Sequence, residues 1–309
     1  MNPAPGKRYF LLILAAIVLL AVVGCRPSAS SSGGKKTIVV TYSLLGSIVK
    51  ELVGDRAVVA VPMPNGLDPH EWEPSAKDIA TINKADLLVQ NGLGLEAGMQ
   101  RALQTAQNKG VRFFTASDHI SIRYVGPGEG VPSGDPDQLA GAPDPHLWMD
   151  PIAMKSVVAA LAAELKTDFD IDVSSQAATL ASQLTSLDQG ISRRVADITA
   201  ENRKLVTGHQ SMGYFAARYG LRLVGVIVPS LSSQAGVSAA DLAALKAAIQ
   251  ENKVKTVFTE LGTNPAVARA IGEETGARVV ELTTHGLPAD GSYFTFMRNA
   301  ADVITNALR

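Results

Sequence analysis

This chain has too few cysteines for a disulfide and no marked excess of acidic or basic residues. Cys25 is the single cysteine among 309 residues. Because a disulfide needs two thiols, no intramolecular bridge can form, and the folded part must draw its stability from an apolar core. The 28 basic and 29 acidic residues give a formal net charge of −1, and neither sign forms a long run. This balance argues against a nucleic-acid-binding surface. With 46% hydrophobic residues, the chain has enough apolar material for one or two well-buried domains.

A long hydrophobic run is missing as well. The apolar stretch from Phe10 to Val23 follows the basic residues Lys7 and Arg8 and has only 14 residues. It is too short for an ordinary membrane span and has the proportions of a secretory signal peptide. We therefore expect residues 1–24 to be removed on export.

The end of this stretch resembles a bacterial lipobox, in which a small residue precedes a cysteine that becomes the lipidated first residue. Here Gly24 precedes Cys25. The alternative is a signal peptide followed by an ordinary buried cysteine. The next residues, RPSASSSGGKK, are rich in Ser and Gly and offer little to bury. We expect residues 25–36 to be a lipidated cysteine with a flexible tether, which would hold the domain at a membrane surface, facing the periplasm or the cell exterior.

From residue 37 onward, short β-branched or apolar runs alternate with segments of helical apolar spacing. This alternation predicts an α/β fold with parallel strands and helices packed over them. Strands are predicted at 37–41, 57–61, 86–90, 111–114, 204–207, 221–228, 256–259 and 278–282, and helices at 44–53, 76–85, 95–106, 151–166, 212–219, 239–252, 264–275 and 293–308.

Two segments interrupt the alternation and divide the chain. Residues 121–144 are rich in Gly, Pro and Asp, which is typical of a surface loop. Residues 171–203 contain no proline and are rich in Ala, Leu, Gln and Ser, which predicts one long helix. We expect this helix to join an N-terminal lobe at 37–170 to a C-terminal lobe at 204–309. Ligands in such folds collect beyond the carboxyl ends of parallel strands and between lobes.

Four of the five histidines lie in loops that resemble one another. His70 lies in GLDPHEWEPS and His146 in APDPHLWMDP, so Asp-Pro-His is repeated with a Trp two residues later. His209 and His285 each follow a predicted strand. A single loop histidine is usually a surface or capping residue, but the repeat favours a shared role. His119, in SDHI, has no such setting, and we expect no metal role for it.

The histidine pattern indicates a metal site assembled from distant loops. Neutral imidazole is the commonest metal ligand, and zinc is usually held tetrahedrally by four nitrogen or sulfur donors. The spacings between His70, His146, His209 and His285 are too long for a zinc finger or an HExxH helix. Their ligands would converge across two lobes. A site divided in this way can close on an ion and open again, as transport requires.

These residues resemble the metal-binding lipoproteins of bacterial ABC importers for zinc and manganese, the cluster A-I solute-binding proteins. The resemblance covers about residues 37–309. It rests on VVTYSLLGSIVKELVGD, NGLDPHEWEPS, NGLGLE, DPHLWMDP, TGHQSMGYFAARYG and GSYFTFMRNAADVI. It implies two α/β lobes bridged by one long helix, with the metal in the cleft. It also implies a membrane permease and its ATPase as partners, a lipid anchor in the membrane, a monomer and no enzymatic activity.

The resemblance also assigns residues. His70 and His146 match the two N-lobe ligands, and His209 matches the first C-lobe ligand, which is His in zinc-type members and often Glu in manganese-type ones. The fourth ligand of the family is usually an Asp in an Asp-Ser-Leu loop. Here His285 stands at that position, and Asp290 is the alternative ligand. An all-nitrogen shell favours zinc as the bound ion, with manganese, iron and copper as alternatives.

Carboxylates near the site would have to offset the charge of the ion, because four imidazoles leave it uncompensated. Glu260 and Asp290 are the candidates, and the plain alternative for Glu260 is a helix-capping or surface acid. Two rival functions stay open. A secreted zinc hydrolase would use three histidines with Glu260 as its base. A metal-binding adhesin or chaperone would bind the ion but would not deliver it to a permease.

Overall fold

The computed structural model describes residues 34–126, 129 and 140–309. The predicted signal peptide, Cys25, most of the tether and half of the 121–144 loop lie outside these residues. Residues Lys36–Arg309 form one compact unit. In this described part, no helix combines the length and apolar character needed to cross a membrane.

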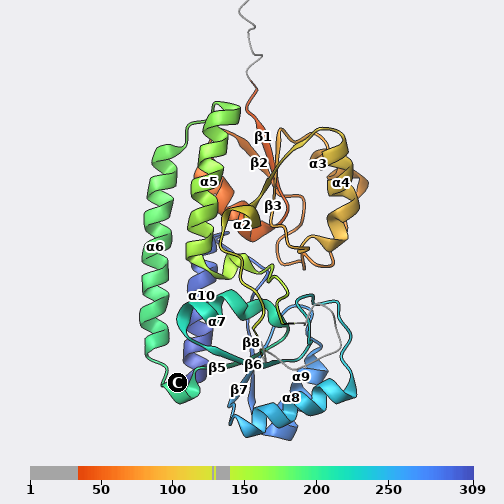
Figure 1. The fold of residues 1–309 in the computed structure, drawn as a ribbon, viewed down its shortest axis with the longest axis vertical. Coiled ribbons are helices and arrows are strands. Elements are labelled where there is room, and N and C mark those ends of the chain that lie inside the picture. The colour runs from red at the N-terminus through yellow and green to blue at the C-terminus, as the bar shows by residue number, and fades with distance from the viewer. Residues whose placement is uncertain (1–33, 127–128, 130–139) are drawn as a thin grey trace, which may run out of the picture. The chain divides into compact units, whose positions relative to one another are not determined.

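The N-terminal lobe is built on a parallel sheet in the order β2-β1-β3-β4 (Figure 1). The central strands are apolar runs whose residues are almost all buried, as expected of a parallel sheet covered on both faces. The strands are β1 Thr37–Val40, β2 Val58–Ala60, β3 Leu87–Gln90 and β4 Arg112–Thr115, and the helices are α2 Ser43–Val53, α3 Ala76–Ile82 and α4 Gln100–Asn108.

Helix α4 begins later than the sequence predicts. Leu95 was the expected first residue, but the chain first makes a 3-10 turn at Ala97–Met99. The delay follows from Gly92, Leu93 and Gly94, which all have positive φ and hold the chain out of the right-handed helix just before this point.

Helices α5 Pro151–Phe169 and α6 Ser174–Ala196 pack side by side, and α6 runs along one side of both lobes (Figure 1). Asp150 begins α5 by accepting a hydrogen bond from the backbone N–H of Ile152, with Pro151 in the first helical turn. Helix α6 covers Ser174–Ala196 of the segment 171–203. Beyond its end, the Arg203 guanidinium turns back and donates to the carbonyl of Ala196, the last helical residue, and to that of Ile198.

The C-terminal lobe contains two parallel strand pairs, β5–β6 and β7–β8, and β5 also contacts β7. Helices cover these strands, so the predicted α/β class with parallel strands flanked by helices is confirmed. The strands are β5 Lys204–Thr207, β6 Arg222–Val226, β7 Thr256–Thr259 and β8 Arg278–Glu281, and the helices are α7 Gly213–Tyr219, α8 Ala239–Glu251, α9 Pro265–Thr275 and α10 Tyr293–Leu308.

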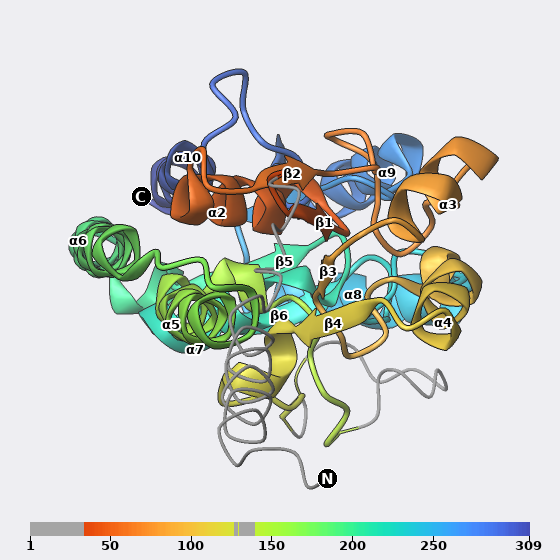
Figure 2. The same ribbon diagram turned by 90° about the horizontal axis from the view of Figure 1, so that it is seen from above.

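The largest hydrophobic cluster belongs to both lobes. It includes Leu52 from α2, Leu184 from α6, Leu205 from β5 and Met297 from α10. Helix α10, at the end of the chain, packs on both α6 and α2, as the view from above also shows (Figure 2). The two lobes therefore share one core, which fixes the loops that face each other between them.

Candidate metal site

The four predicted histidines meet between the lobes. One potential ligand atom of each lies within 4.8 Å of the others, in the closest His/Asp/Glu grouping of the described residues that could hold an ion. Nε2 of His146 lies 3.3 Å from Nε2 of His70 and 3.2 Å from Nε2 of His209. The side chains are almost completely removed from solvent, with exposures of 3% or less for His70, His146, His209 and His285.

Each lobe contributes two histidines. His70 lies in the loop after β2, and His146 directly precedes a 3-10 turn at Leu147–Met149. His209 follows β5 and His285 follows β8. Three of the four therefore lie beyond the carboxyl ends of parallel strands, where ligands collect in α/β folds.

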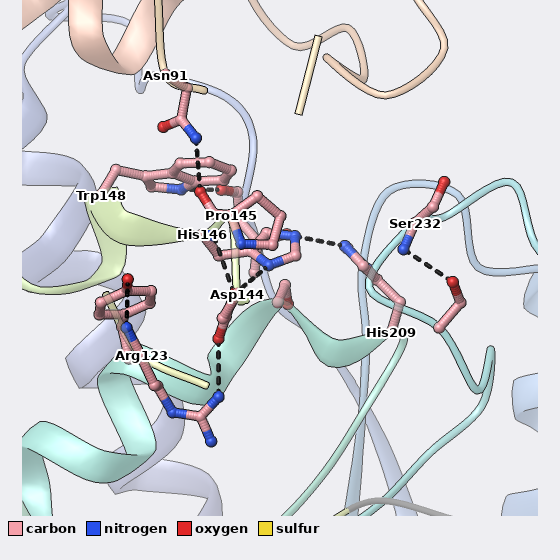
Figure 3. A network of polar contacts seen from close by, with 12 residues as sticks. Asn91, Arg123, Asp144, Pro145, His146, Trp148, His209 and Ser232 are labelled. Atoms are coloured by element: carbon pink, nitrogen blue, oxygen red, sulfur yellow. Dashed lines mark hydrogen bonds and ion pairs between the residues drawn. The ribbon is translucent and has the colours of Figure 1, made fainter. Parts of the chain in front are cut away.

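The two Asp-Pro-His segments form matching turns. The Oδ1 atom of Asp68 accepts a hydrogen bond from the backbone N–H of His70 at 2.9 Å, and Asp144 does the same for His146 at 3.0 Å. These are Asx-turns, which fix the backbone two residues after the aspartate. Asp144 Oδ1 also lies 2.8 Å from Nδ1 of His146, so Nε2 of that ring faces the other histidines (Figure 3).

The second oxygen of Asp144 is also held. Its Oδ2 lies 2.9 Å from Nη1 of Arg123 (Figure 3), and Arg123 in turn pairs with Glu129. The backbone N–H of Arg123 donates to the Tyr214 hydroxyl at 2.9 Å, which links this arrangement to the C-terminal lobe. Burial raises the pKa of Asp144 to about 6, because it outweighs the nearby Arg123.

In the C-terminal lobe, the carboxylate that accepts hydrogen bonds beside the histidines is Glu260, which directly follows β7. Its Oε1 accepts from the backbone N–H of His209 at 3.0 Å, and Oε2 accepts from the hydroxyls of Ser211 and Thr284, each at 2.6 Å. Nδ1 of His209 lies 3.4 Å from Oε2. Position 208, just before His209, requires glycine, because a Cβ at Gly208 would lie 2.4 Å from Cγ of Glu260.

His285 uses a hydroxyl where the other lobe uses a carboxylate. Its Nδ1 lies 2.8 Å from Oγ1 of Thr284. The carbonyl of Thr284 accepts a hydrogen bond from Nε1 of Trp148 at 3.0 Å, so the loop of His285 is tied to the loop of His146.

Two other predicted residues lie elsewhere. Asp290 is exposed and does not join the histidines, because its carboxylate accepts from the Ser292 backbone at 3.0 Å and the Thr295 hydroxyl at 2.7 Å, at the start of α10. His119 is exposed and stacks on Phe114, with ring centroids 4.5 Å apart. Asp68, Asp144 and Thr284 were missed. The repeated Asp-Pro-His motif was the available signal for the two aspartates.

The electrostatics keep three of the four imidazoles neutral in the metal-free protein. Burial, followed by the neighbouring imidazoles, holds the pKa of His70 and of His146 well below the ordinary value. The same causes lower the pKa of His285 to about 4. Burial acts against charge on His209 too, but Glu260 and the more distant aspartates together raise its pKa.

The arrangement is suited to a borderline-soft divalent ion. Four imidazole nitrogens match the tetrahedral donor set of zinc. Buried carboxylates on the outer side of the rings orient the ligands and supply negative charge, which is the usual outer support of a histidine–metal site.

Comparison with known proteins agrees with this chemistry. The family model described as zinc-uptake complex component A, periplasmic, matches residues 38–307. The high-affinity zinc uptake system protein ZnuA of Bacillus subtilis is 29% identical, with 98% of each chain covered. The zinc-binding lipoprotein AdcA of Streptococcus pneumoniae is also 29% identical over 93% of this chain, which spans only 58% of that protein. In structure, the periplasmic zinc-binding protein TroA of Treponema pallidum matches with a TM-score of 0.73 and 25% identity, covering 89% of this chain and 99% of that one. The chain belongs to the ZnuA family of zinc-uptake complex components.

Proposed function

We propose that this protein captures a divalent transition metal outside the cytoplasm, with zinc favoured, and delivers it to the permease and ATPase of an ABC importer. The observation that carries the proposal is the meeting of His70, His146, His209 and His285, two from each lobe, with ligand atoms within 4.8 Å of one another. Ligands shared between two lobes allow capture and release by a small change in their separation.

The donor set supports zinc as the cargo. Zinc is readily held by four nitrogen donors, whereas manganese prefers oxygen. With His285 at the position where the family usually has Asp, we propose a shell of four nitrogens. Manganese is the leading alternative cargo, and its binding would be weaker at such a site.

Transport is a better proposal than hydrolysis. A catalytic zinc has three protein ligands, an open position for water and a nearby general base. In the proposed site the fourth histidine would take the position of that water. Glu260 is also poorly suited to be a base, since its two oxygens already accept hydrogen bonds from the His209 backbone, Ser211 and Thr284.

The proposed working form is a lipid-anchored monomer. Residues 1–24 are proposed to be the signal peptide, and Cys25 to carry the lipid at the head of a tether that ends at Lys36. The N-terminal lobe would span 37–170 and the C-terminal lobe 204–309. The protein would then face the periplasm or the cell exterior, close to the permease in the same membrane.

The decisive experiment measures metal content and uptake together. The mature protein, purified in detergent and stripped of metal, is titrated with zinc and then with manganese. We expect one zinc per chain and weaker manganese binding. Cells lacking the gene should take up less zinc, and wild-type protein should restore uptake while His146→Ala should not. Binding of zinc without any effect on uptake would favour the adhesin or chaperone.

A further inference from the structure

The residue before His285 has a hydrogen-bonding role that no other ligand loop of the site repeats. Thr284 is 1% exposed, and its hydroxyl contacts two groups, Glu260 Oε2 at 2.6 Å and His285 Nδ1 at 2.8 Å. The remaining ring nitrogen, Nε2 of His285, is buried and has no hydrogen-bond partner among the described residues.

The directions of these hydrogen bonds follow from the chemistry of the groups. A hydroxyl has one proton to donate, and an ionised carboxylate can only accept. The Thr284 proton must therefore go to Glu260. The hydroxyl oxygen is then left as an acceptor for His285, so Nδ1 of that ring carries the proton and Nε2 carries the lone pair.

This direction leaves the lone pair on Nε2, the ring nitrogen that Thr284 does not occupy, and one ligand atom of His285 lies within 4.8 Å of those of the other three histidines. The ring centroid of His285 lies 5.3 Å from that of His209 and 6.0 Å from that of His70. The opposite tautomer would present an N–H to the ion and could not coordinate it. The hydroxyl thus decides whether a histidine at this position can act as a ligand.

We infer that Thr284 is a positioning residue that makes His285 an Nε2 ligand by extending the hydrogen bonds of Glu260 to Nδ1 of the ring. One carboxylate then supports both histidines of the C-terminal lobe, His209 directly and His285 through one hydroxyl. The inference rests on the proposed metal-binding function. It also bears on metal preference, because the supported ligand atom is a nitrogen, which suits zinc better than manganese.

The backbone of Thr284 is fixed independently of its hydroxyl. Its carbonyl accepts from Nε1 of Trp148, and the OH of Tyr293 donates to the Trp148 carbonyl at 2.6 Å. Replacement of the hydroxyl alone should therefore leave the loop in place. Thr284→Val keeps the shape of the side chain and removes only the hydrogen bonds.

The test compares Thr284→Val, Thr284→Ser and a control, Thr283→Val, in the full-length mature protein. Thr283 is exposed and makes no side-chain hydrogen bond to another described residue. Loss of an outer hydrogen bond typically weakens metal binding about 10–100-fold. We expect that loss of zinc affinity for Thr284→Val, recovery to within about threefold of wild type for Thr284→Ser, and no change for the control.

A double-mutant cycle with His285→Asp separates positioning from general packing. A carboxylate ligand has no tautomer, so Thr284→Val should cost less in the His285→Asp background, where only the hydrogen bond to Glu260 is lost. Equal losses of zinc affinity in both backgrounds would overturn the inference. Wild-type affinity in Thr284→Val, or no recovery in Thr284→Ser, would overturn it as well.

A measurement on the metal-free protein distinguishes failure of this inference from failure of the proposed function. Nitrogen NMR shifts of the His285 ring should show a protonated Nδ1 in wild type and in Thr284→Ser, and a mixture of tautomers in Thr284→Val. If the wild-type protein bound no zinc, the proposed function would be wrong, while these shifts would still decide the role of Thr284. An Nε2-protonated ring in wild type would overturn the inference.

Discussion

Asp144 holds both the backbone and the ring of His146 with a single oxygen atom. Its Oδ1 lies 3.0 Å from the backbone nitrogen and 2.8 Å from Nδ1 of the ring. The corresponding Asp68 contacts only the backbone of His70, at 2.9 Å, and its other oxygen accepts from Ser233 at 2.6 Å. The two turns are alike in backbone, but only Asp144 contacts the ring of its histidine.

This difference predicts unequal effects of two matched substitutions. Asp144→Asn removes the charge that supports the His146 ring, and we expect zinc affinity to fall about 10–100-fold. Asp68→Asn keeps an oxygen that can accept from the His70 backbone and should cost less. Competition with a chelator of known affinity measures both, and equal losses would show that ring support by Asp144 is not special.

Loss of a histidine ligand should weaken zinc binding more than loss of its support. We expect alanine at His70, His146 or His209 to lower affinity by about 100-fold or more, because a three-ligand remnant must recruit water. His119→Ala is the control, since His119 is exposed and stacks on Phe114. Titration with zinc gives the affinities. Unchanged affinity in any of the three ligand variants would contradict the site.

The fourth position is tested by His285→Ala against Asp290→Ala. Because His285 is buried among the other histidines and Asp290 is exposed at the start of α10, only the first change should affect zinc. We expect His285→Ala to resemble His209→Ala in its loss of affinity. Isothermal titration of both variants decides between them, and a large loss in Asp290→Ala would favour an oxygen ligand.

Zinc binding should release far fewer than four protons per ion near neutral pH. The pKa is lowered for His70, His146 and His285, so these rings are already neutral there. The pKa of His209 is raised, mainly by Glu260 against the effect of burial, so this is the ring of the four whose protonation competes with zinc first as the pH falls. Affinity should therefore fall as the pH drops below the raised pKa of His209, by up to about tenfold per pH unit. Calorimetry in buffers of different ionisation enthalpy counts the protons. A release near four, or a flat affinity between pH 7.5 and 5.5, would contradict this account.

Processing at Cys25 is a separate prediction, since this residue lies outside the part of the chain that the structure describes. Cys25→Ser should release the protein from the membrane fraction or leave it unprocessed, because the hydroxyl cannot take the thioether-linked lipid. Fractionation and mass analysis measure both results. A variant that stays membrane-bound at mature size would disprove the lipobox.

Much of the fold could be predicted from local patterns in the sequence. The prediction that His209 and His285 each follow a strand agrees with the ends of β5 and β8, because strand periodicity and loop composition are local properties. The contacts beyond the end of α6 could not be predicted, since Arg203 reaches back five residues to the carbonyl of Ile198. The role of Thr284 also escaped prediction, because it depends on Glu260, 24 residues away in sequence. Asp290 was a plausible ligand by composition alone, but its carboxylate is held at the start of α10 by the Thr295 hydroxyl and does not join the histidines.

The core that α2, α6 and α10 build together limits how the protein can release its cargo. A wide rotation of the lobes would pull Leu52, Leu184 and Met297 apart and expose apolar surface, at about 25 cal/mol for each square ångström. The shared core therefore favours small displacements of the four ligand loops over a wide rotation of the lobes. We expect metal to be exchanged by small movements of the ligand loops and not by a hinge rotation of the lobes.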